Sequence, residues 1–82
     1  MYRILTEAKN VEEIMATLTG LGLDFSIANL LGSWKGKKEN SISIEMDYVT
    51  RQQAVDAALI IKSMNDQEAV LLQEVATVSE LL

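Results

Sequence analysis

The most regular part of the chain alternates between apolar and polar side chains over residues 41–49, the pattern of a half-buried strand. The apolar positions of this predicted strand are Ile42, Ile44, Met46 and Tyr48. Looser alternation predicts two earlier strands, over residues 1–6 and 23–31. Asn29 interrupts the alternation of the second, which indicates a β-bulge there.

Two other stretches repeat their apolar residues with a helical period. The first begins at Asn10, which has capping-box spacing to Glu13, and Gly20 ends it. The second begins at Thr50, which has the same spacing to Gln53, and residues 65–66 end it. The apolar face of the first helix consists of Val11, Ile14, Met15 and Leu18.

The remaining segments complete a small α+β domain that spans residues 1–82. Residues 69–75 include good helix formers, but the segment is short and follows a turn, so a strand is predicted. Residues 76–82 form either a short tail or a further strand, and the polar, Gly-containing residues 32–40 form a loop or a hairpin tip. The order β-α-β-β-α-β indicates a ferredoxin-like sandwich, with one antiparallel sheet and two helices on one face.

Composition favours self-association of this domain. The chain has 82 residues, 49% of them hydrophobic, and no Cys, so a small core gains no support from disulfides. In the ferredoxin-like order the strand at residues 69–75 lies at the sheet edge. This strand lacks the Lys or Pro that protects an edge from pairing. We therefore expect a homo-oligomer.

Charge and residue types exclude several classes of function. The net charge of −5 disfavours a nucleic-acid partner, because phosphate binding relies on many Lys and Arg. The absence of His excludes a Ser-His-Asp triad and a His-based zinc site. No apolar run approaches the length of a signal peptide or a membrane helix, so we expect a cytoplasmic protein without a membrane partner.

One cluster of residues suggests ligand binding. The candidate ligand-binding residues are Trp34, Lys35, Gly36, Lys37, Lys38 and Ser41. Trp34 is either a packed structural residue or a stacking platform for a flat ligand such as a nucleobase. The lysines reverse the overall charge locally, and with a flexible Gly they suit a phosphate or another anion. They are equally compatible with a solvated hairpin tip.

Carboxylates supply the remaining candidate chemistry. Glu39 follows the lysines and suits a ribose hydroxyl, a cation or a proton, or else it forms only a loose surface pair. Glu45 and Asp47 share a strand face, but two carboxylates fall short of the oxygen ligands that Ca²⁺ needs. No metal site and no cofactor is predicted.

A longer pattern resembles the small phage-encoded S-adenosylmethionine lyases. It consists of Gly32-x-Trp34-x-Gly36, Glu39-x-Ser41 before a strand, an Ala-rich helix, and Asn65-x-Gln67-Glu68-Ala69-Val70-Leu71. The resemblance implies a ferredoxin-like trimer similar to the PII signalling proteins, with Glu39 as the catalytic residue. Trp34 stands where these enzymes carry Tyr, and its interval to Glu39 is shorter than theirs. Phage accessory proteins on such scaffolds also sequester nucleotide signals.

Three classes of function therefore remain at this point. The first is an oligomeric protein that binds or sequesters a nucleotide-like small molecule. The second is a relative of the S-adenosylmethionine lyases, which would bind that substrate and turn it over. The third is a protein-interaction module that buries its apolar surface against a partner.

Overall fold

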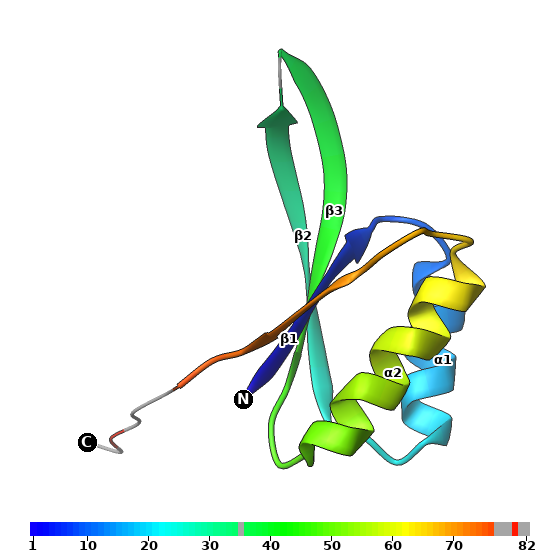
Figure 1. The fold of residues 1–82 in the computed structure, drawn as a ribbon, viewed down its shortest axis with the longest axis vertical. Helices are drawn as coiled ribbons and strands as arrows, with labels where there is room; N and C mark the ends of the chain where they lie inside the picture. The colour runs from blue at the N-terminus through cyan, green and yellow to red at the C-terminus, as the bar shows by residue number, and fades with distance from the viewer. Residues whose placement is uncertain (35, 77–79, 81–82) are drawn as a thin grey trace.

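A computed structural model describes residues 1–34, 36–76 and 80, and of residues 32–34 and 37–39 it describes only the backbone. Four strands form one sheet in the order β2-β3-β1-β4, and every neighbouring pair is antiparallel. Both helices lie on the same face of this sheet (Figure 1). The elements are β1 (Tyr2–Glu7), α1 (Val11–Gly20), β2 (Phe25–Trp34), β3 (Lys37–Met46), α2 (Arg51–Met64) and β4 (Leu71–Glu74). The predicted α+β class, four-stranded antiparallel sheet and pair of helices are confirmed.

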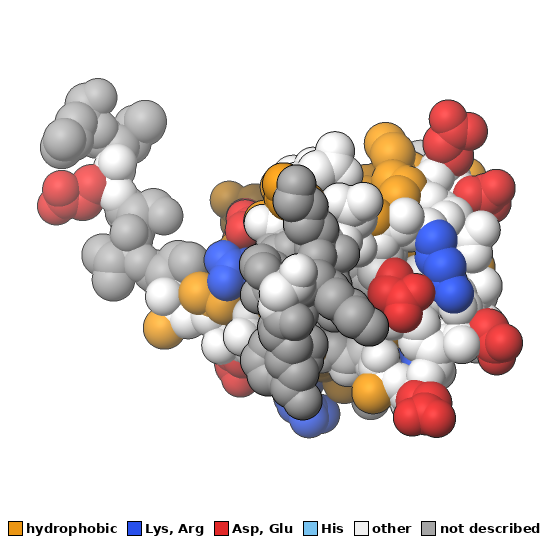
Figure 2. Space-filling model, turned by 90° about the horizontal axis from the view of Figure 1, so that it is seen from above, with side chains coloured by type: hydrophobic (Ala, Val, Ile, Leu, Met, Phe, Trp, Pro, Cys, Tyr) orange, Lys and Arg blue, Asp and Glu red, His pale blue; other side chains and the backbone are white. Residues whose placement is uncertain are grey.

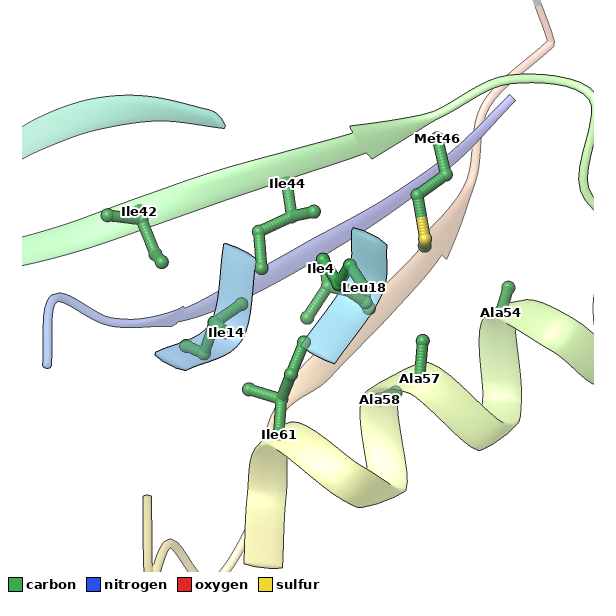
Figure 3. Close-up of a cluster of buried hydrophobic side chains, with 10 residues drawn as sticks. All are labelled: Ile4, Ile14, Leu18, Ile42, Ile44, Met46, Ala54, Ala57, Ala58 and Ile61. Carbon is green, nitrogen blue, oxygen red and sulfur yellow. The ribbon is translucent and has the colours of Figure 1, made fainter. Parts of the chain in front are cut away.

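The hydrophobic core fills the space between the sheet and the helices. Ile4 of β1 and Ile42, Ile44 and Met46 of β3 are fully buried, and their side chains point toward the helical layer (Figure 3). The short Ala side chains of α2 let this helix approach the sheet closely. The core consists of Ile4, Ile14, Leu18, Ile42, Ile44, Met46, Ala54, Ala57, Ala58 and Ile61.

A long hairpin projects beyond the body of the molecule (Figure 1). β2 and β3 pair without interruption from Phe25 opposite Met46 to Trp34 opposite Lys37. The neighbouring strand β1 ends at Glu7 opposite Ser41, so the pair continues alone past this point. Of the two alternatives for residues 32–40, the loop is therefore wrong and the hairpin tip is confirmed, because backbone pairing extends both strands to Trp34 and Lys37. The bulge expected at Asn29 is also wrong, because the register is continuous there.

Three local predictions need correction. β3 ends at Met46 and Tyr48 turns away with φ 58, so Tyr48 is 99% exposed rather than part of the buried face. Asn10 adopts φ 55 and makes no side-chain cap, so the reciprocal bond with Glu13 is absent. Gly20 is the last residue of α1, and Gly22 takes the positive φ expected at the helix end.

Other predictions hold. Thr50 and Gln53 form the capping box that begins α2. The segment around β4 is a strand and not a helix, although it is shorter than predicted. Of the tail, residues 77–79 and 81–82 lie outside the described part of the chain. Neither described helix combines the length and the apolar character needed to cross a bilayer.

Candidate functional site

A broad hollow in the described surface lies where the hairpin leaves the body of the molecule. Its volume is about 510 Å³, and we call it the hairpin-base concavity. It forms because β1 ends beside β3 while the segment after α2 returns to the same end of the sheet. Its lining residues are Leu5, Thr6, Glu7, Ala8, Lys9, Asn40, Ser41 and Gln67.

A network of polar side chains fixes one wall of the concavity. Thr6 Oγ1 donates a hydrogen bond to Gln67 Oε1, which holds the Gln67 side chain against the end of β1. Asn65 Nδ2 lies 3.4 Å from Thr6 Oγ1 and 3.3 Å from Gln67 Oε1. Asn65 is buried, so these bonds compensate for the loss of its hydration. The network therefore joins β1 to the segment that follows α2.

Asn10 extends the network to both helices. Its Nδ2 atom donates to Asn65 Oδ1 at 3.1 Å and to the carbonyl oxygen of Met64 at 3.3 Å. The left-handed backbone of Asn10, a conformation that Asn tolerates better than most residues, turns the chain from β1 into α1. The beginning of α1 and the end of α2 are thereby held together behind the concavity.

The charged residues of the concavity come from the last residue of β1, Glu7, and from the segment that follows it. The Glu7 carboxylate lies 3.5 Å from Lys9 Nζ, and both side chains are about half exposed. The Ala8 N–H donates to the Asn40 carbonyl at 3.3 Å and ties this segment to β3. Figure 2 looks onto this end of the molecule and shows acidic side chains in several separate places around the coloured surface. Lys9 therefore places a cation beside the Glu7 carboxylate in the concavity.

The structure divides the predicted ligand-binding set between two places. Ser41 lines the hairpin-base concavity. Gly36 is exposed at the hairpin tip with φ 78, a conformation that suits glycine. The remaining predicted residues fall on backbone-only or undescribed positions. Trp34, Lys37, Lys38 and Glu39 are strand residues whose side chains lie outside the described part, and Lys35 lies outside it altogether.

Tip and base are well separated along the hairpin. Lys37 and Ser41 are four strand residues apart, which corresponds to roughly 13 Å at about 3.3 Å per residue. A nucleoside-sized ligand seated beside Ser41 therefore does not reach the tip of the same chain. The sequence had suggested one cluster, made by residues 32–40 and by Ser41 at the start of the following strand.

Sequence reasoning missed most of the concavity. Thr6, Glu7 and Lys9 were not singled out, and only the pairing of β1 with β3 brings them to Ser41. Gln67 was named only within the lyase-like pattern, without a role in the site. The available signal was the run of polar residues after the first predicted strand. Among the described residues, no group of three or more side chains is suited to a metal ion. Comparisons with known protein families and with curated proteins found no match.

Proposed function

We propose that this protein binds a nucleotide-like small molecule in the hairpin-base concavity. The observation that carries the proposal is the concavity itself. Its volume of about 510 Å³ falls within the range of roughly 300–1,000 Å³ typical of small-molecule sites. Ser41, which the sequence predicts to bind the ligand, lies in its wall.

The lining offers the kinds of contact that a nucleotide requires. Leu5 and Ala8 supply apolar surface for a base, while the amides of Asn40 and Gln67 supply donors and acceptors. Lys9 supplies a cation for a phosphate, although the ion pair with Glu7 partly neutralises its charge. The Ser41 hydroxyl suits a ribose or phosphate oxygen. Trp34 and the lysines at the hairpin tip would contact the ligand only if it extended along the hairpin or bridged two subunits.

Removing two polar side chains of the hairpin-base concavity, those of Lys9 and Ser41, tests the proposal. The unmodified protein is first screened by thermal shift with nucleoside phosphates and S-adenosylmethionine. The double substitution Lys9→Ala/Ser41→Ala should then weaken binding of the strongest hit by about 1–2 kcal/mol, the sum of a screened charge contact and a neutral hydrogen bond. Titration calorimetry measures this loss.

Arg51→Ala is the matched control. It also removes one positive charge, but it lies at the opposite end of α2 from Gln67, about 20 Å away along the helix. Binding should be unchanged in this variant. If binding is unchanged in the double variant and Trp34→Ala weakens it instead, the ligand binds at the hairpin tip and not in the concavity.

A lyase relative is the alternative within this site. It depends on Glu39, whose backbone lies opposite Gly32 and directly before Asn40 of the concavity. Product analysis after incubation with S-adenosylmethionine separates the two functions. A binding protein forms no methylthioadenosine over hours. If product forms and Glu39→Gln lowers turnover by about 100-fold, the size of one positioned acid–base group, the lyase function is correct.

The sheet order supports placing the domain among ferredoxin-like folds. β1 and β2 are both antiparallel to β3, which lies between them, and α1 connects them. β3 and β4 flank β1 in the same way and are connected by α2. Two such interleaved β-α-β units are the arrangement that the sequence predicts for this class.

A further inference from the structure

The outer edge of β4 presents unpaired backbone groups. The Val75 N–H donates to the Met1 carbonyl at 2.8 Å, and the Met1 amino group donates to the Val75 carbonyl at 3.3 Å. Antiparallel pairs of this kind recur every second residue, so Gln73 also bonds to β1. The backbone N–H and C=O groups of Leu72 and Glu74 consequently point away from β1. No strand among the described residues lies on that side.

An apolar groove accompanies this edge on the helical face. It lies between α2 and β4, with a volume of about 250 Å³, and Leu59 is 57% exposed beside it. Leu72 and Glu74 point to this face, because their partners on β1, Ile4 and Tyr2, pack in or against the core. The groove is lined by Val55, Ala58, Leu59, Lys62, Ala69, Val70 and Leu72.

We propose that the free edge of β4 pairs with β4 of a second copy of this chain, antiparallel and about a two-fold axis at Leu72. This register joins outward-facing backbone groups to one another, as an antiparallel ladder requires. It continues the sheet from one subunit into the next. It also brings the two α2–β4 grooves together, so that Leu59 and Leu72 of both subunits become buried.

Charge complementarity identifies the occupant as a second copy. Lys62, near the end of α2, and Val70, directly before β4, both line the groove. In the proposed register Val70 of one subunit lies opposite Glu74 of the other. Each Glu74 is thereby directed toward Lys62 of the partner subunit, and the symmetry makes this ion pair twice. Although the net charge of the chain is −5, the proposed dimer thus places a lysine of one subunit near a glutamate of the other.

This interface shares no lining residue with the hairpin-base concavity, so it stands apart from the proposed ligand site. It predicts a particle of two chains and not the trimer that the lyase resemblance implies. Light scattering and sedimentation over a micromolar concentration series measure the particle mass. At the upper end of this concentration series, the measured particle mass of the unmodified protein should be twice the mass of one chain.

Proline substitution tests the backbone pairing. Glu74→Pro removes an outward N–H and should raise the dissociation constant about tenfold or more, since two symmetry-related hydrogen bonds are lost. The melting temperature of the dissociated chain should change little. Gln73→Pro is the contrasting variant, because its N–H faces β1. It should lower the melting temperature instead.

A charge swap tests the register. Lys62→Glu and Glu74→Lys should each weaken the dimer by about tenfold, because each places like charges together twice. The double substitution should restore the affinity to within about threefold. A single-chain particle at every concentration would overturn the proposal. So would a dimer or trimer whose dissociation constant does not respond to Glu74→Pro or to the charge swap.

Discussion

Asn65 shows how a single polar residue organises the region behind the concavity. It is 1% exposed, and its amide group bonds to Asn10, Thr6 and Gln67. An unpaired amide at this depth would be costly, so its partners must be positioned together. In the sequence Asn65 was recognised as the end of a helix and as part of the lyase-like pattern, but not as a buried residue, because a helix-ending Asn and a buried Asn look alike there.

Removal of this amide should destabilise the whole domain. Asn65→Ala removes the hydrogen bonds that join Asn65 to Asn10, Thr6 and Gln67, and we expect the free energy of unfolding to fall by about 1–3 kcal/mol. In a domain of this size that loss lowers the melting temperature by roughly 4–8 °C per kcal/mol. Urea denaturation followed by circular dichroism measures the effect.

The exposed residue Asn29 provides the control for this substitution. Asn29→Ala should change the free energy of unfolding by less than about 0.5 kcal/mol, as surface substitutions usually do. Equal losses in the two variants would show that the buried network does not contribute specifically to stability.

At the scale of elements, the sequence predicted the parts that pack against the core and missed those that do not. Periodic apolar residues such as Ile42 and Ile44 identified β3, and the Thr50 capping box identified α2. The outer half of the hairpin carries polar residues and glycines, so nothing in its pattern distinguishes a strand from a loop. Its strands pair through their backbones, which side-chain alternation does not report.

The hairpin should consequently open more readily than the rest of the sheet. On the tip side of Ser41, β3 pairs with β2 but no longer with β1, and Leu31 opposite Asn40 is 73% exposed. A two-stranded ribbon without a packed face is only marginally stable. Native-state hydrogen exchange should therefore be faster for the hydrogen-bonded amides of β3 between the hairpin tip and Ser41, residues 37–40, than for those around Ile44. Equal protection throughout β3 would indicate that another surface covers the hairpin.

At the scale of the whole molecule, the candidate site results from contacts between distant parts of the chain. Ser41 was predicted from its neighbours in sequence, whereas Lys9 and Gln67 reach it only through the sheet order β2-β3-β1-β4. Such pairings between distant segments leave no local pattern. The predicted set was therefore centred on the hairpin tip, while the structure provides a concavity at the hairpin base.

The most direct test of the account is to map where a nucleotide binds. Amide chemical shifts are recorded by nuclear magnetic resonance while the unmodified protein is titrated with the nucleotide that stabilises it most in the thermal-shift screen. The account predicts that the largest changes fall at residues 5–9, 40–41 and 67, with little change along the α2–β4 groove. Changes confined to residues 34–38, or centred on residues 55–62, would contradict it.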